Sequence, residues 1–224
     1  ILGGVLIQAE NHSVTLVATD LEIGIRYRMD EVQVDQPGWA VVPGRELVDV
    51  IKDTESETIT LCIQSGDQCT VTAGEDECVL VTMESCIDGS SDPEAFGSLP
   101  VLEGEADVVL NKEDFLVMVG STRFSTSRTH NMRFATEGVL VEVDGKRVTF
   151  VGTDGRRLAC IHRDSIGGTG EKRRSVLLPK VLDQILRFGQ DENADTLSVF
   201  FLQNQVGFKV GNLESFGRVL DGEF

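Results

Sequence analysis

The sequence contains an internal repeat, and a repeat constrains the fold of a chain more than any other feature. The segment Gly4–Asp20 matches the segment Gly138–Asp154 without a gap, because Gly138 follows Gly4 by 134 positions and the same separation holds throughout. In both copies apolar and polar residues alternate, Val, Ile and Thr are frequent, and turn-forming residues lie in the middle. The repeat therefore predicts the same β-hairpin twice.

A second pattern recurs at about half that spacing. Apolar strand ends precede Pro43, Asn111 and Pro179, which are 68 positions apart in each step. Proline near the first turn and asparagine as N-cap are typical helix openers. The segments that follow have helical periodicity and are predicted as helices around residues 45–51, 112–118 and 182–186.

Strand-like runs follow the first and third predicted helices, at residues 58–63 and 196–201. The chain is therefore predicted to repeat a unit of one strand, one helix and about three strands, which is an α+β arrangement. Two such units give a domain of about 135 residues, an ordinary size. Gly, Ser and Pro crowd the stretch Asp88–Pro100, which is the predicted linker between domain 1–100 and domain 101–224. On this count the chain enters its first repeat unit after the helix.

Composition narrows the classes of protein that fit. No apolar run approaches the roughly 20 residues that cross a bilayer, so no membrane span is predicted. The net charge of −17 argues against a protein that wraps nucleic acid with its whole surface, because Lys and Arg make phosphate contacts. A contact with DNA would have to be local.

The cysteines and histidines predict neither a metal site nor a cofactor. The cysteines form an odd set without a CxxC pair, and we predict them to be reduced thiols of the core. The three histidines are near neither one another nor the cysteines in sequence, which does not fit the ligand spacing of zinc. The cysteines are Cys62, Cys69, Cys78, Cys86 and Cys160.

Four motifs carry a resemblance to a known family. The segment Ala18–Ile23 (ATDLEI) and the segment Thr153–Ala159 (TDGRRLA) resemble the first- and second-domain motifs of the bacterial DNA sliding clamp, the beta subunit of DNA polymerase III. Val42–Arg45 and Leu220–Phe224 are similar to two further segments of that family. The resemblance runs the whole length, and it implies a first strand and helix before Ile1 and a third domain beyond Phe224.

The resemblance implies a clamp fold whose helices line the channel of a ring and whose sheets lie outside. It implies a homodimer that encircles double-stranded DNA regardless of sequence and confers processivity, without a catalytic site or a cofactor of its own. The implied partners are the DNA polymerase catalytic subunit, the clamp loader and other proteins with a clamp-binding motif. The implied location is the cytoplasm, at the nucleoid during replication.

The resemblance implies DNA contacts at Arg45, His130, Phe134 and Ala135. Arg45 opens the first predicted helix, where a phosphate would meet both a guanidinium and a helix N-terminus. The alternative for Arg45 is a solvated pair with Asp49. His130 and Phe134 lie in the basic, aromatic-containing segment Arg123–Phe134, and Ala135 follows it; the alternative for this segment is a capped loop that enters a strand.

A client-peptide pocket is implied at Thr136, Thr153, Gly155, Arg156, Arg157 and Leu158. Such pockets combine an apolar floor with a few polar groups that orient the peptide. Arg156 stands where the family usually has His, and Thr136 where Leu is common, so a more polar floor is expected. The alternative is that Thr-Asp-Gly is only a tight turn, and Asp20 in the sister copy favours this alternative for Asp154.

Three other interpretations have less support. The segment Gly167–Lys172 resembles a phosphate-binding loop but lacks the full spacing, which favours an ordinary loop. An enzyme that uses the repeated Thr-Asp turns would need a concave polar site with perturbed groups, and a protein-binding scaffold would lack the DNA-contacting arginines. The sequence places no nucleophile, base and orienting residue together.

Overall fold

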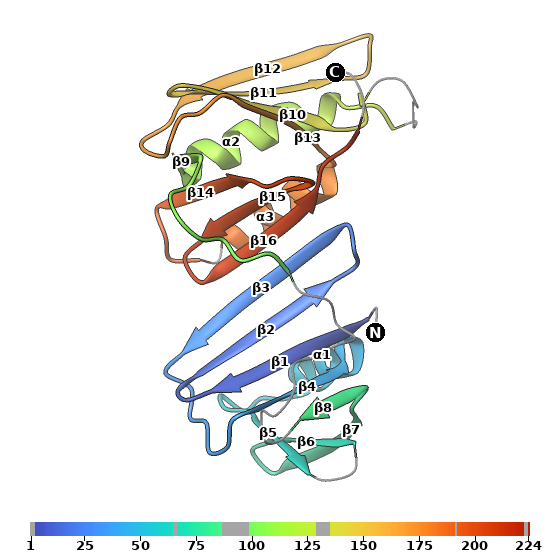
Figure 1. Cartoon of the computed structure of the whole chain (residues 1–224). Coiled ribbons are helices and arrows are strands. Elements are labelled where there is room, and N and C mark those ends of the chain that lie inside the picture. The colour runs from blue at the N-terminus through green and yellow to red at the C-terminus, as the bar shows by residue number, and fades with distance from the viewer. Residues whose placement is uncertain (1–2, 65–66, 87–98, 129–134, 191, 222–223) are drawn as a thin grey trace. The chain divides into compact units, whose positions relative to one another are not determined.

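The computed structural model describes residues 3–64, 67–86, 99–128, 135–190, 192–221 and 224. The chain divides into two compact units, Ile1–Leu99 (unit 1) and Pro100–Phe224 (unit 2) (Figure 1). Of the predicted linker, only Leu99 and Pro100 are among the described residues.

Unit 1 contains two antiparallel sheets and one helix. The larger sheet has the strand order β8-β4-β1-β2-β3, and the smaller has the order β5-β6-β7. Helix α1 packs against β1, β4 and β7. The elements are β1 (Gly4–Glu10), β2 (Ser13–Thr19), β3 (Ile23–Asp30), β4 (Gly38–Pro43), α1 (Gly44–Asp53), β5 (Thr60–Gln64), β6 (Gln68–Ala73), β7 (Asp76–Val81) and β8 (Glu84–Cys86).

Unit 2 contains two four-stranded antiparallel groups, β12-β11-β10-β13 and β16-β15-β14-β9, with two α-helices. Helix α2 lies between the two groups and contacts β11, β12, β14 and α3 (Figure 1). The elements are β9 (Val108–Asn111), α2 (Lys112–Thr122), the 3-10 turn η1 (Arg123–Ser125), β10 (Val139–Asp144), β11 (Arg147–Thr153), β12 (Leu158–Asp164), β13 (Arg173–Leu177), α3 (Pro179–Gly189), β14 (Thr196–Phe201), β15 (Gln205–Val210) and β16 (Leu213–Arg218).

The structure confirms the repeated hairpin. Ile7 lies opposite Leu16 in the first copy, and Val141 lies opposite Phe150 in the second. Each of these second-copy residues is 134 positions after its counterpart, so the two hairpins share one register. The turns also match, because Asn11 (φ 50°) and Gly145 (φ 61°) occupy the same place with the same left-handed backbone.

The three predicted helices are confirmed, each preceded by a strand. Their starts differ in detail from the prediction. Pro43 is the N-cap of α1, whereas Pro179 is already inside α3. Asn111 is the N-cap of α2, but its side chain makes no capping hydrogen bond, so the expected side-chain cap is wrong.

The two units have different cores. In unit 2, Phe115 of α2 is fully buried, and its ring lies 5.7 Å from the rings of both Phe150 and Phe208 in edge-to-face geometry. In unit 1 one core cluster is mostly aliphatic and is built around Leu47 and Val42, and a second contains the buried Trp39. The cluster of three phenylalanine rings therefore distinguishes the core of unit 2.

The prediction that the cysteines are core thiols holds only in part. All five are free and lie in strands. Cys69 is buried, and burial raises the pKa of its thiol. Cys62 and Cys160 are exposed, which corrects the prediction for them, because a β-strand directs alternate side chains to opposite faces and apolar neighbours do not tell which face is covered.

The glycine-rich segment Gly167–Lys172 is an ordinary loop. Its backbone is bound to the start of unit 2, where Gly170 N donates to Asp107 O at 3.0 Å and Val109 N donates to Gly167 O at 2.9 Å. Strand β13 follows it, not the helix that a phosphate-binding loop requires. The loop is thus bound to the first strand region of unit 2, and its interpretation as a phosphate-binding loop is wrong.

Candidate functional site

The turn between β11 and β12 is built by two side chains that bind its own backbone. The hydroxyl of Thr153 donates to Arg157 O at 2.7 Å and accepts from Gly155 N at 3.1 Å. One carboxylate oxygen of Asp154 accepts from the N–H groups of Arg156 and Arg157, each at 3.0 Å. These bonds fix the loop in one shape without using the side chains that follow Asp154.

The same framework occurs in unit 1, at the end of β2. Thr19 donates to Ile23 O at 2.9 Å and accepts from Leu21 N, while Asp20 accepts from the N–H groups of Glu22 and Ile23. Thr153 and Asp154 therefore have a structural role that does not depend on any ligand. The tight-turn alternative explains these two residues, and it leaves Arg156, Arg157 and Leu158 to be explained.

Arg157 is held by three groups. Its guanidinium donates to Phe124 O at 2.8 Å, lies 5.8 Å from the centre of the Phe124 ring, and pairs with Asp154 at 3.1 Å. The N–H groups of Arg156 and Arg157 hold the pKa of Asp154 below its usual value, and the Arg157 charge acts in the same direction. The result is an arginine with a fixed direction at the surface of unit 2.

Arg156 and Leu158 face solvent on either side of Arg157. Within the part of the chain that the structure describes, the Arg156 side chain makes no hydrogen bond and no ion pair. Leu158 is 66% exposed although it is a large apolar residue. Gly155 has a left-handed backbone (φ 81°) with open space where a Cβ would lie. Charge, apolar area and space are thus available here for a partner.

The remaining predicted peptide residue, Thr136, is half-buried, and its carbonyl accepts from Ser127 N at 2.7 Å. Among the predicted DNA-contacting residues, His130 and Phe134 lie outside the described residues. Ala135 is 3% exposed and packs with Leu140 and Val176, so the predicted contact of this residue with nucleic acid has little accessible surface in this structure.

Arg45 is exposed at the second position of α1. Among the described residues it has no ion-pair partner, so the alternative pair with Asp49 is not formed. The side chain is therefore free to meet an anion near the N-terminus of the helix.

One role was not predicted from the sequence. Sequence reasoning identified Phe124 only as part of the basic, aromatic segment Arg123–Phe134. In the structure its carbonyl oxygen accepts a hydrogen bond from Arg157, and its ring lies against the Arg157 guanidinium. The two residues are 33 positions apart. No local pattern signals this contact.

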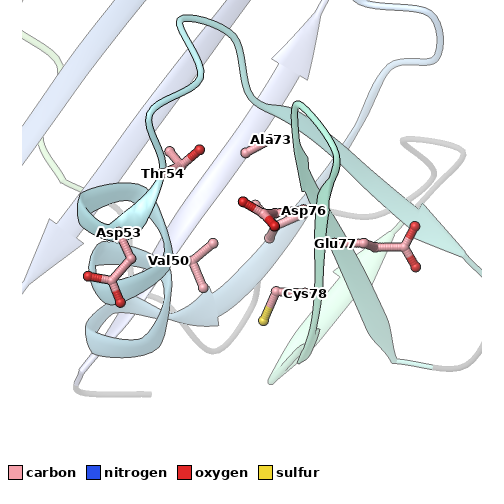
Figure 2. Close-up of a pocket in the computed structure, with 8 residues that line it drawn as sticks. Val50, Asp53, Thr54, Ala73, Asp76, Glu77 and Cys78 are labelled. Carbon is pink, nitrogen blue, oxygen red and sulfur yellow. The ribbon is translucent and has the colours of Figure 1, made fainter.

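Two hollows on the surface lie away from these residues. One, of about 210 Å³, lies between the end of α1 and strands β6 and β7 (Figure 2). Its lining includes Val50, Asp53 and Cys78. A second, of about 270 Å³, is lined by the Gly167–Gly170 loop and its neighbours. Neither of these two hollows is lined by a predicted site residue.

Neither a metal-ligand cluster nor a membrane-spanning helix is found among the described residues. There, no cluster of three or more His, Cys, Asp or Glu side chains could hold a metal ion. None of the helices in that part is long and apolar enough to span a bilayer.

Two family models match this chain. The model for the N-terminal domain of the DNA polymerase III beta subunit matches residues 1–86, and the model for its central domain matches residues 109–224. The chain belongs to the DNA polymerase III beta subunit family. The resemblance seen in the four motifs is thereby confirmed.

Curated relatives and solved structures agree with the family models. The beta sliding clamp of Staphylococcus aureus is 28% identical over 231 residues, and that of Staphylococcus epidermidis is 26% identical. Each alignment covers 100% of this chain and 58% of the relative, so the chain spans little more than half of their length.

Among solved structures, the DNA polymerase sliding clamp of Bacillus subtilis matches with a TM-score of 0.86 and the DNA polymerase III beta subunit of Pseudomonas aeruginosa with 0.85. Both are 22% identical, and they cover all of this chain and 58% and 59% of those chains respectively. The predicted α+β sliding-clamp fold is confirmed.

Proposed function

We propose that this chain acts as part of a sliding clamp that encircles duplex DNA and keeps the replicative polymerase on its template. The observation that carries the proposal is that both units match the beta-subunit family, over residues 1–86 and 109–224. The clamp would act as a homodimeric ring in the cytoplasm and would perform no catalysis on DNA. Its partners would be the polymerase, the clamp loader and other proteins with a clamp-binding motif.

The charge of the chain suits a ring that must hold DNA and still slide. A net charge of −17 opposes a tight grip on phosphates by the surface as a whole. Retention by topology does not need a tight contact, because a closed ring leaves DNA only by opening or by reaching an end. Weak, sequence-independent contacts are then sufficient.

Arg45 is the proposed DNA contact that the structure supports best, with His130, Phe134 and Ala135 as further proposed contacts. Its side chain is exposed at the start of α1 and has no ion-pair partner among the described residues. A phosphate at this place would gain both the guanidinium charge and the helix dipole.

The proposed surface for client peptides is the turn that joins β11 and β12. Thr136, which shortly precedes β10 in the chain, is a further proposed contact. Thr153 supports this turn, Gly155 leaves space above it, and Arg156, Arg157 and Leu158 supply the contacts. The proposal is supported by the combination of Arg157, whose direction is fixed, with the exposed Leu158. Peptide sites likewise combine polar groups that orient the peptide with an apolar area that binds its side chains.

Retention on DNA of different topology tests the proposed clamp function. The full-length protein is loaded by a clamp loader onto nicked circular DNA, and the bound fraction is measured before and after the circle is cut. We expect retention on circles and loss after linearisation. Equal retention on both forms would contradict a sliding ring and favour an enzyme or a scaffold.

The contribution of Arg45 is tested with Arg45→Ala and a matched control, Arg28→Ala, which removes the same charge from strand β3. Binding to a short duplex is measured over a range of salt concentrations. We expect Arg45→Ala to reduce the slope of log affinity against log salt by about 1, because one phosphate contact is lost. Equal slopes for the two variants would remove Arg45 from the DNA contacts.

A further inference from the structure

We infer that Asp183 limits how firmly the channel of the clamp grips DNA, because it holds Arg123 in an ion pair and so keeps this cation from a phosphate. The inference rests on the proposed function, since it concerns contacts made while the clamp encircles a duplex. It adds a positioning residue, Asp183, that acts on DNA only through Arg123.

The two residues belong to the helical layer of unit 2. Arg123 opens η1 directly after α2, and Asp183 lies in the second turn of α3. The Arg123 guanidinium pairs with the Asp183 carboxylate where α2 and α3 contact each other. The two residues are 60 positions apart in the chain, so the pair depends on how the helices pack.

The pair lies on the solvent side of the two helices. Phe115 of α2 and Leu182 of α3 are fully buried, which turns the apolar faces of the helices inward. The side chains of Arg123 and Asp183 are instead 42% and 44% exposed. Because helices line the channel in the sliding-clamp fold, a solvent-facing cation at this place would meet the duplex.

The charge balance of unit 2 makes each unpaired cation important. Unit 1 has 19 acidic and 4 basic residues, whereas unit 2 has 18 acidic and 16 basic residues. The attraction of unit 2 for phosphate therefore depends on which of its cations are bound to its own carboxylates. Arg187 of α3 has no ion-pair partner among the described residues, while Arg123 has Asp183.

Asp183 opposes a phosphate contact in two ways. It competes for the guanidinium, although the competition is mild because an ion pair with both partners half-exposed is screened by water. A phosphate that displaced it would also lie near the Asp183 carboxylate, and like charges repel. A contact of Arg123 with DNA is therefore weakened without being abolished.

A weakened contact suits a ring that slides. A closed ring is retained by topology, so it gains little from a firm phosphate contact. Each such contact must break before the ring can advance along the duplex. Pairing Arg123 with Asp183 therefore favours movement over grip.

A double-mutant cycle on the full-length protein tests the inference. Affinity for a short duplex is measured from about 50 to 200 mM salt for the unchanged protein, Asp183→Asn, Arg123→Ala and the double variant. We expect Asp183→Asn to bind more tightly at low salt and to steepen the slope of log affinity against log salt by about 1, so its advantage shrinks about threefold over this range. Arg123→Ala and the double variant should both keep the original slope.

Two controls separate this effect from a change of net charge or of structure. Asp49→Asn removes the same charge from α1, where the carboxylate has no ion-pair partner among the described residues, and should change the slope much less. Asp183→Glu keeps the charge and should keep the slope. If the pair only joined α2 to α3, Asp183→Asn and Arg123→Ala would lower the melting temperature alike and neither would steepen the slope.

Sliding provides a second readout. The full-length protein is loaded onto circular duplex, and its one-dimensional diffusion is followed by single-molecule fluorescence. We expect Asp183→Asn to diffuse more slowly than the unchanged protein, and the double variant to recover the original rate. Recovery in the double variant would show that the effect passes through Arg123.

The outcomes separate the inference from the proposed function. If the protein is retained on circular DNA but Asp183→Asn does not steepen the slope, or steepens it equally without Arg123, the inference is wrong and the clamp function stands. If the protein is not retained on circles, the proposed function fails and the inference fails with it.

Discussion

The two copies of the repeat have the same backbone and differ in the side chains that they present. Thr19 and Asp20 make the same hydrogen bonds as Thr153 and Asp154. After the aspartate the copies diverge, since Leu-Glu-Ile in unit 1 stands in the place of Gly-Arg-Arg in unit 2. Residues common to both copies build the fold, and residues found in one copy alone mark what that unit does separately.

A second difference precedes the turn and has a packing cause. Ala18 of unit 1 corresponds to Gly152 of unit 2, 134 positions later. In unit 2 the end of α2 lies on this position, with Thr122 O only 2.2 Å from where a Cβ would be. The glycine is therefore a requirement of the α2 contact in unit 2.

The largest expected effect comes from exchanging these two residues. Gly152→Ala should lower the free energy of unfolding of unit 2 by about 1–3 kcal/mol, because a backbone oxygen must move. Ala18→Gly should cost unit 1 only about 0.5–1 kcal/mol, the usual cost of glycine in a strand. Hydrogen exchange of the strand amides reports each unit separately.

The comparison would break if the two substitutions had equal effects. Equal costs would mean that α2 adapts to the added methyl group, and that Gly152 does not set the position of Phe124. Peptide binding by Gly152→Ala gives a second measure, which should weaken together with the stability of unit 2.

The sequence predicted the fold well because its strongest signals are local or periodic. The hairpin register followed from the repeat, and the three helices followed from Pro43, Asn111 and Pro179 at equal spacing. The exposure of Cys62 and Cys160 was missed, because strand composition does not reveal which face is covered.

The site was less accessible to sequence reasoning. The Thr-Asp turn was visible, and its structural role followed from the sister copy. The contact between Phe124 and Arg157 could not be predicted, because it joins residues 33 positions apart and depends on how closely α2 approaches β11. Whether Arg45 pairs with Asp49 was also open, because a helical spacing of four permits a pair and does not require one.

An intermediate effect is expected at the turn itself. Leu21 (φ 74°) has a left-handed backbone that costs a leucine about 1–2 kcal/mol, whereas its counterpart Gly155 (φ 81°) has no such cost. Leu21→Gly should therefore stabilise unit 1 by roughly 0.5–1 kcal/mol, since the side chain is 74% exposed and little packing is lost. Gly155→Leu should destabilise unit 2 by about 1 kcal/mol.

Thermal unfolding of both variants is the measurement, and opposite signs are the expected result. Destabilisation by Leu21→Gly would instead mean that the exposed leucine contributes a contact that outweighs its backbone strain. In that case Leu21 would be an apolar surface residue of unit 1 comparable to Leu158 of unit 2.

The smallest effect concerns charge at the two aspartates. Asn keeps an oxygen that accepts the turn N–H groups, so Asp154→Asn and Asp20→Asn should both retain the turn and lose only the charge. The pKa of Asp154 is lowered in the folded chain by the N–H groups of Arg156 and Arg157 and by the Arg157 charge. The stability that this charge contributes is therefore fully present above the ordinary carboxyl pKa of about 4 and is lost as pH falls through the folded value.

The melting temperature of the chain should thus exceed that of Asp154→Asn slightly at neutral pH, and the two should converge below about pH 4. The effect should be smaller than either glycine effect, because the carboxylate and Arg157 both contact water. Asp20→Asn is the matched control, since Ile23 stands where Arg157 stands in unit 2 and offers no ion pair. A difference that persisted unchanged down to pH 3, well below the ordinary carboxyl pKa of about 4, would show that the side chain acts through shape and not through charge, and would remove Asp154 from the groups that hold Arg157 electrostatically.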